Sequence, residues 1–129
     1  GTLNGNPVAS VAGLATLDVL RGEGIYNQTA ARGRRLREGF QEVLNHAEIP
    51  AQVVGHDTVF DVYFTEDPEP ISNYRDTLKA DKKKMIKLND LLLERGVFKG
   101  ETKYYVSTAH SDDDVDRTMG AFKSAVEDL

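Results

Sequence analysis

The residues that could do chemistry are few and widely separated in this sequence. The histidines are His46, His56 and His110, and no second histidine follows any of them at the i+3 or i+4 position. The chain has no cysteine, which excludes a thiolate metal site and a cysteine nucleophile. Ser107 lies near His110, but the Gly-x-Ser-x-Gly turn that exposes a serine nucleophile is missing. The sequence therefore predicts no metal site and no catalytic residue.

Two clusters of like charge have ordinary structural explanations. The aspartates at 112–114 suit the first turn of a helix, where carboxylates interact favourably with the positive end of the helix dipole. Their spacing is not that of an EF-hand loop. The lysines at 82–84 point in successive directions on a helix, which is typical of a solvated face rather than an anion site.

The segment Gly1–Pro7 is the one candidate binding site. It is a turn rich in glycine and asparagine that leads directly into a capped helix. Backbone N–H groups, the Thr2 hydroxyl and the positive end of a helix dipole together favour an oxyanion such as a phosphate. An ordinary helix start has the same composition, so on these residues alone both interpretations stay open.

The first element that must position this turn is a helix beginning at Pro7. Asn6 can cap it, and proline suits the first helical position because its missing N–H would have no partner there. Its apolar surface extends around much of its circumference, so we expect it to be covered on more than one side. Gly22–Gly24 ends this helix, and a second helix is expected from about Tyr26 to about His46. The expected core positions of the second helix are Ala30, Gly33, Leu36, Phe40, Val43 and Leu44.

The hydrophobic period then changes to two, which indicates strands. We expect a short strand at 51–54, a turn at Gly55-His56-Asp57 and a longer strand at 58–65, paired as an antiparallel hairpin. Phe60, Val62 and Phe64 fall on one face of the longer strand. Val59, Asp61 and Tyr63 fall on the other face.

Helical spacing returns after the acidic, proline-containing loop Glu66–Ser72, which we interpret as a solvated connection. A third helix is predicted from about Arg75 to Arg95, followed by strand segments at 97–98 and 103–108. Ser111 caps a last helix, with Asp114 placed for a capping box. This order predicts an α+β fold, a small antiparallel sheet covered by helices and preceded by a long connecting helix.

Composition limits the classes of function. The chain has 129 residues, a single domain's worth, and 16 basic against 21 acidic residues give a net charge of −5. Nucleic-acid binding domains are usually basic, so we expect no nucleic-acid partner. The uncharged stretch at 1–16 is too short and too polar for a membrane span, so we expect no membrane partner. The absence of cysteine fits a reducing compartment, and a cytoplasmic location is expected.

The opening residues also resemble a known family. Gly1–Pro7, continuing through Val8–Leu17, is similar to the Gly-Thr-x-x-Gly-Asn-Pro stretch of class III pyridoxal-phosphate aminotransferases. Tyr74–Asp76, Leu93–Val97 and Val106–Ser111 resemble the C-terminal part of glutamate-1-semialdehyde 2,1-aminomutases and related transaminases. The resemblance covers the whole chain and only the C-terminal portion of that family, so we expect a fragment of a longer enzyme.

The resemblance implies specific roles. Gly1 and Thr2 would contact the phosphate of pyridoxal 5'-phosphate held by the other subunit of a homodimer. Residues 1–24 would form this phosphate turn and an interdomain helix, and residues 25–129 a small α+β domain on the substrate side. The family's Schiff-base lysine lies before the Gly-Thr motif, and no lysine here matches it. The chain alone is therefore expected to be catalytically incompetent, with an amino acid or amino ketone as substrate of the parent enzyme.

One segment departs from the aminomutase pattern. After Gly96-Val97, the aminomutases have a longer loop with Pro-Ser and a glutamate facing the active site. The segment Phe98–Tyr104 is shorter and lacks Pro-Ser, so Glu101 is not equated with that glutamate. This favours an aminomutase-like transaminase over a mutase. The alternative from a different class is a free-standing α+β interaction module that binds no cofactor.

Overall fold

Capping side chains and glycines set the ends of most elements. The computed structural model describes residues 1–129. In chain order, the elements are α1 (Pro7–Leu20), α2 (Ile25–His46), β1 (Ala51–His56), β2 (Val59–Phe64), α3 (Tyr74–Thr77), α4 (Lys82–Glu94), β3 (Tyr104–Tyr105) and α5 (Asp112–Glu127). The side chains of Asn6, Asn73, Asp81 and Ser111 each accept backbone N–H groups at the start of a helix.

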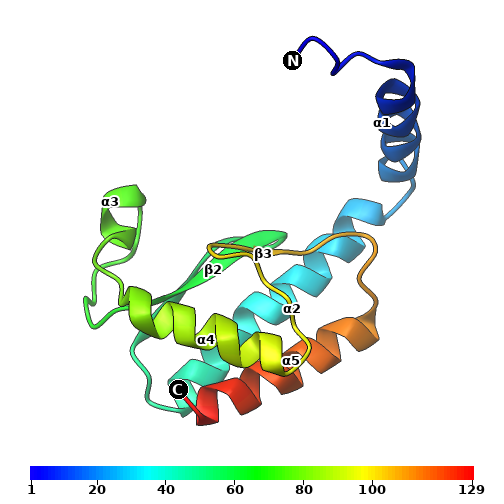
Figure 1. The fold of residues 1–129 in the computed structure, drawn as a ribbon. Coiled ribbons are helices and arrows are strands. Elements are labelled where there is room, and N and C mark those ends of the chain that lie inside the picture. Colours follow the sequence, from blue (N-terminus) through cyan, green and yellow to red (C-terminus); the bar gives the residue numbers. More distant parts are fainter.

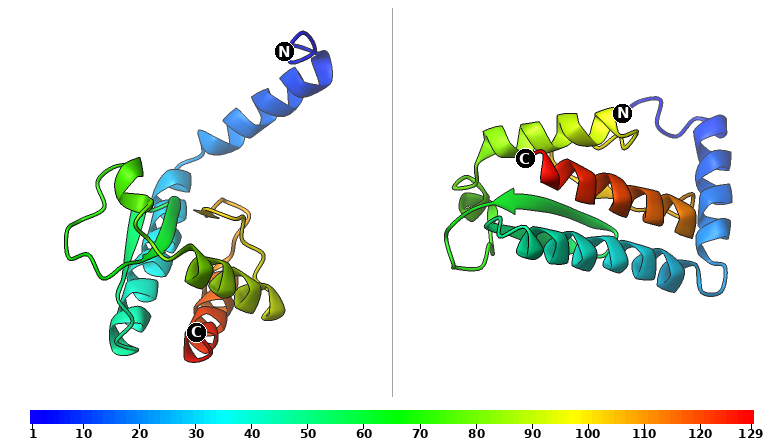
Figure 2. Two further views of the ribbon diagram at one scale, coloured as in Figure 1. Left: turned by 60° about the vertical axis from the view of Figure 1, so that its left-hand side comes forward. Right: turned by 90° about the horizontal axis from the view of Figure 1, so that it is seen from below.

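The three strands form one antiparallel sheet in the order β1-β2-β3. The helices α2, α5 and α4 lie side by side on one face of this sheet (Figures 1 and 2). Alternate residues of β2 point toward those helices, which is why Phe60, Val62 and Phe64, predicted to share one face, are buried. The predicted α+β fold, a small antiparallel sheet covered by helices, is confirmed.

Aromatic rings join the sheet to the helices in the core. The rings of Phe40 on α2 and Phe122 on α5 stack with 3.7 Å between centroids. Phe40 also meets Phe60 and Tyr104 edge to face, at 5.9 and 5.2 Å. Because a fully buried side chain of this size contributes about 1.5–3 kcal/mol, this cluster is a major source of stability.

Helix α1 projects away from this core and buries none of its own residues (Figure 1). It is the sequence segment with the widest apolar surface, yet Val8, Val11 and Leu14 are all exposed. Only the last part of α1 approaches α2 (Figure 2). The covering predicted for this helix is therefore not provided by these 129 residues.

The hairpin differs from the prediction at its turn. β1 continues through Gly55 and His56, which pair with Phe60 and Val59, so the predicted turn at 55–57 is wrong. Gly55 has a φ of +142°, and a Cβ there would lie 2.6 Å from the Cα of Phe60. Glycine at this position permits close approach of the two strands and does not end the first one.

The predicted third helix is two helices in the structure. α3 ends at Thr77, and Asp81 begins α4 by accepting the N–H groups of Lys83 and Lys84. The Asp81 N–H donates to the Phe64 carbonyl at 2.9 Å, which ties the break to the end of β2. Leu78 fits the apolar spacing of a single helix, but it is 49% exposed at this break. Aspartate can interrupt a helical pattern in this way because its carboxylate competes for nearby backbone N–H groups.

The last predicted strand is much shorter in the structure. Only Tyr104–Tyr105 pairs with β2, opposite Phe60 and Val59, and the predicted strand at 97–98 is absent. Beyond that pair, the edge of β2 from Asp61 onward has no strand beside it. Asp61, Lys99 and Lys103 form a buried cluster at this free edge, described below.

Candidate functional site

The predicted phosphate site is an exposed turn at the free end of α1. The N–H of Asn4 donates to the Gly1 carbonyl at 3.1 Å, and the N–H of Asn6 donates to the Leu3 carbonyl at 3.2 Å. The Asn6 side chain accepts the Ala9 N–H and donates to the Leu3 carbonyl, which fixes the approach of the turn to the helix. Gly1 and Thr2 both lie in this turn and are exposed.

The free groups of this turn fit an anion. The N–H groups of Thr2, Leu3 and Gly5 donate to no acceptor in the chain, and the Thr2 hydroxyl makes no hydrogen bond. Thr2 and Leu3 lie just before the N-terminus of α1, whose unpaired N–H groups carry partial positive charge. No acidic residue lies in Gly1–Thr16. The turn therefore offers donors without a competing carboxylate, which is the chemistry that a phosphate requires.

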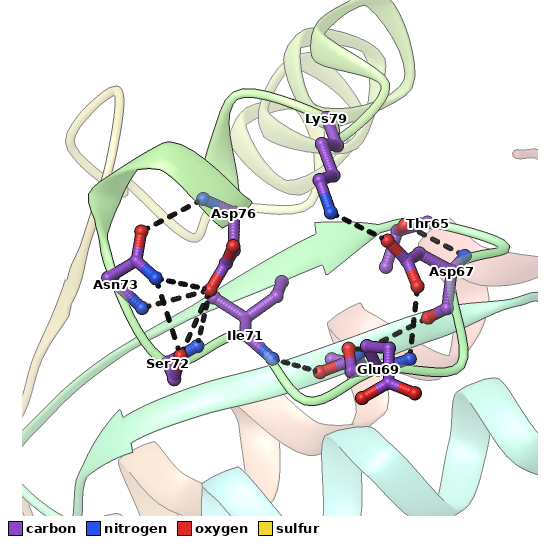
Figure 3. Close-up of polar contacts among 9 residues, drawn as sticks. Thr65, Asp67, Glu69, Ile71, Ser72, Asn73, Asp76 and Lys79 are labelled. Atoms are coloured by element: carbon purple, nitrogen blue, oxygen red, sulfur yellow. Dashed lines mark hydrogen bonds and ion pairs between the residues drawn. The ribbon is translucent and has the colours of Figure 1, made fainter.

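A second polar site lies at the loop between β2 and α3, shown in Figure 3. The Gln52 amide organises this loop by donating to the carbonyls of Asp67 and Glu69 and accepting the N–H of Ile71. Lys79 donates to the Asp67 carboxylate at 2.9 Å across the loop (Figure 3). The predicted solvated connection is thus an ordered loop with its own hydrogen-bond network.

The carboxylates of this loop are already occupied. One oxygen of Asp76 accepts the N–H and the hydroxyl of Ser72, and the N–H and side-chain amide of Asn73 (Figure 3). The hydrogen bond from the Ser72 N–H is the main cause that lowers the pKa of Asp76, and the Lys79 ammonium lowers the pKa of Asp67. Side chains held in this way order the loop and do not form a cation site.

A third cluster is buried at the free edge of β2. Asp61 is 1% exposed, and its carboxylate lies 3.2 Å from the Lys99 ammonium and 3.8 Å from the Lys103 ammonium. Lys103 also donates to the Tyr63 hydroxyl at 2.9 Å. Burial raises the pKa of Asp61 and lowers that of Lys99, because each ion loses hydration that its partners only partly replace.

Sequence reasoning missed this cluster. The alternation of β2 predicts only that Asp61 shares a face with Val59 and Tyr63, and the residue is among the most buried in the chain. Its partners come from the loop at 97–103, about forty residues away along the chain. The available signal was an aspartate between Phe60 and Val62 followed by two lysines outside any helix, which is weak without the fold.

The remaining candidate residues are not brought together. His46, His56 and His110 lie on separate elements, and the structure has no group of acidic, histidine or cysteine side chains that could hold a metal ion. Ser107 and His110 do meet, with 3.2 Å between the hydroxyl and Nδ1, but Nδ1 also accepts the Ser107 N–H in a local turn before α5. None of the helices combines the length and apolarity that a membrane crossing requires.

The two curated relatives described here carry the same name and align with the whole chain. No protein-family model matches the chain. All of the chain aligns with glutamate-1-semialdehyde 2,1-aminomutase from Desulfosudis oleivorans at 35% identity and with that from Desulfitobacterium hafniense at 32% identity. The chain spans 30% of the length of these two relatives.

Solved structures agree with these relatives. An omega-transaminase from Sphaerobacter thermophilus is 30% identical, with a TM-score of 0.86 over 99% of this chain and 29% of that protein. A glutamate-1-semialdehyde aminomutase from Pseudomonas aeruginosa, at 17% identity and a TM-score of 0.72, shares the fold over 84% of this chain and 24% of its own. The resemblance indicated by Gly1–Pro7 and the later segments is confirmed.

Proposed function

Because the whole chain is similar to part of the glutamate-1-semialdehyde 2,1-aminomutases and of an omega-transaminase, we propose that it is one portion of a pyridoxal-phosphate-dependent class III aminotransferase. The observation that carries this proposal is the exposed Gly1–Pro7 turn, whose free N–H groups and Thr2 hydroxyl fit a phosphate. The chain supplies this turn and a small domain on the substrate side of the enzyme.

Thr2 and the backbone beside it hold the cofactor phosphate in this proposal. The Thr2 hydroxyl and the N–H groups of Thr2 and Leu3 would donate to oxygens of the cofactor phosphate, and the other subunit of a homodimer would hold that cofactor. Bound pyridoxal phosphate supplies the electron-withdrawing ring that the transfer of an amino group requires. Hydrogen bonds to a charged phosphate orient the cofactor without bonding to it covalently.

The chain divides into two working parts in this proposal. Residues 1–24 form the phosphate turn and an interdomain helix, whose exposed apolar side chains are covered by the rest of the enzyme. Residues 25–129 form the small domain. The family resemblance places the lysine that bonds to the cofactor before the Gly-Thr turn. All eight lysines of this chain, from Lys79 to Lys123, lie after the turn, so in this proposal that lysine comes from outside these residues. The chain alone is therefore not catalytic.

The loop after α4 favours transamination over the mutase reaction. It lacks the Pro-Ser pair of the aminomutases, and the Glu101 side chain is exposed and makes no hydrogen bond. Glu101 therefore has no support as the active-site glutamate of a mutase. We propose an aminomutase-like transaminase acting on an amino acid or an amino ketone.

Replacing Thr2 tests the phosphate contact. In the complete dimeric enzyme, Thr2→Ala should weaken retention of pyridoxal phosphate about 10- to 150-fold, since a hydrogen bond to a charged group contributes roughly 1.5–3 kcal/mol. Thr2→Ser, which keeps the hydroxyl, should retain most of the affinity. Absorbance of the bound cofactor during dialysis measures the retention of pyridoxal phosphate by each variant.

Thr16→Ala is the matched control, because the Thr16 hydroxyl bonds only to the Ala12 carbonyl within α1. It should leave cofactor retention as in the unmodified enzyme. Equal retention by Thr2→Ala and Thr16→Ala would refute the contact. A purified complete protein that binds no pyridoxal phosphate would instead favour the interaction module, with α1 as its binding surface.

A further inference from the structure

In the loop from Val97 to Lys103, only the first residue donates a backbone hydrogen bond. The Val97 N–H donates to the Leu92 carbonyl at 2.9 Å, but no N–H from Phe98 to Lys103 donates to any acceptor. Six consecutive residues whose N–H groups donate no hydrogen bond would ordinarily be mobile. Another interaction must therefore define the path of this loop between α4 and β3.

The Lys99 ammonium provides this interaction from inside the loop. It donates to the carbonyl of Gly100 at 3.2 Å and lies 3.4 Å from that of Glu101, so the loop curves around its own cation. The same ammonium lies 3.2 Å from the Asp61 carboxylate and 4.9 Å from the centre of the Tyr104 ring. The Lys99 side chain is only 3% exposed.

Asp61 connects this loop to the sheet. Because β3 ends beside Phe60 and Val59, the Val62 N–H has no strand partner and donates to the Asp61 carboxylate at 3.0 Å instead. The oxygen that accepts this N–H is also the one that contacts Lys99. A single carboxylate thus satisfies the Val62 N–H at the open edge of β2 and anchors the cation at the centre of the loop.

The far side of the loop is held more loosely. Asn89 on α4 donates to the Glu101 carbonyl at 3.3 Å, and Lys103 reaches the second oxygen of Asp61 only at 3.8 Å. Between these contacts, the Phe98 side chain is 85% exposed and lines a hollow together with Tyr105 and Val106. The position of Phe98 in this hollow therefore depends on the contacts of its neighbour, Lys99.

We infer that Lys99 is a positioning residue, whose ammonium folds the loop at 97–103 around itself and fastens it to Asp61, so that Phe98 is presented as a fixed wall of the hollow. A buried ammonium with three oxygen acceptors is fully used in this role, which excludes it as a nucleophile or a ligand-binding group in this conformation. The inference does not depend on the proposed function.

Nuclear magnetic resonance relaxation of the full 129-residue chain tests this role. The backbone amides of Gly100 and Glu101 should have order parameters near 0.85, as in rigid backbone, and Lys99→Met should reduce them below about 0.6. Lys123→Met is the matched control, because Lys123 is an exposed lysine without an ion pair. It should leave both order parameters unchanged.

The double variant Asp61→Leu/Lys99→Met separates positioning from general stability. Replacing both charges removes the unpaired buried ion of each single variant, so its denaturation midpoint should lie closer to the wild type than either single variant. The Gly100 and Glu101 amides should nevertheless be as mobile as in Lys99→Met, because the double variant also lacks the Lys99 ammonium at the centre of the loop.

Rigid Gly100 and Glu101 amides in a folded double variant would overturn the inference, as would mobile amides in the wild type. If the double variant does not fold, Lys99→Met alone decides, and order parameters equal to those of the wild type would then refute the role of Lys99.

Discussion

At the scale of single residues, Gly33 allows the hairpin to lie against α2. A Cβ at this position would lie 1.7 Å from the Asp57 carbonyl oxygen, and Arg34 and Arg37 bind the Asp57 carboxylate at 3.0 and 3.1 Å. Gly33→Ala should lower the free energy of unfolding by about 1–3 kcal/mol, because the turn must move and loses these contacts. Chemical denaturation measures the change.

Gly120→Ala is the control for this substitution. Gly120 is also inside a helix, but no atom lies within 4 Å of a Cβ built on it. Alanine should therefore stabilise α5 by about 0.5–1 kcal/mol through its higher helix propensity. Equal effects of the two substitutions would show that propensity, and not contact with the hairpin, determines the cost at Gly33.

Single residues also show where sequence reasoning ends. Phe60, Val62 and Phe64 were predictable as core because each fits a period of two beside apolar helices. Asp61 follows the same period, yet it is buried because Lys99 and Lys103 reach it from a loop without periodicity. No local pattern encodes that meeting, since it depends on how far β3 extends along β2.

At the scale of elements, two capping boxes make the stability of the folded chain depend on pH. The Asp76 carboxylate accepts the N–H groups of Ser72 and Asn73, and the Asp114 carboxylate accepts that of Ser111. These hydrogen bonds, from Ser72 first for Asp76, lower the pKa of both below the ordinary value of 3.8. The unfolded chain then binds protons more readily than the folded one. Their contribution to stability is full above the ordinary pKa and is lost as the pH falls below it.

Asp114→Asn tests this dependence at α5. Denaturation midpoints measured between about pH 5 and pH 3 should fall with the pH in the wild type, and less steeply in the variant, which has no carboxylate to protonate. Parallel curves for the two proteins would contradict a contribution from the Asp114 carboxylate. Ser111→Ala at neutral pH should independently cost about 1 kcal/mol by removing the cap.

The elements were predictable to the extent that their ends carry local signals. Asn6-Pro7 and Ser111 begin helices in the structure as the sequence predicts, because a cap acts within one turn. The break at Asp81 was missed because Leu78 and Met85 continue the helical spacing across it. What interrupts the helix is a hydrogen bond from Asp81 to the distant Phe64 carbonyl.

At the scale of the whole molecule, α1 is an unburied apolar helix attached to a well-packed domain. Exposed apolar surface of this extent favours association in water. The isolated 129-residue chain should therefore self-associate through Val8–Leu20. Light scattering should give a mass above the 14.3 kDa of the monomer, and the double variant Val11→Glu/Leu14→Glu should restore that mass.

The control places the same charges elsewhere. Ile86 and Leu93 are exposed apolar residues on α4, to a degree similar to that of Val11 and Leu14. Ile86→Glu/Leu93→Glu should leave self-association as in the wild type. A monodisperse wild-type monomer, or equal loss of association in both double variants, would contradict a specific role for α1.

Because α1 projects outward, substitutions in α1 and substitutions in the core are constrained by different neighbours. A change at Phe40 must be compensated by Phe60, Phe122 or another neighbour inside the same fold. Val11 and Leu14 are exposed in this chain, so in the proposed enzyme a change at either would be compensated on the surface that covers α1. Paired substitutions between α1 and residues outside this chain would identify that surface from sequences alone.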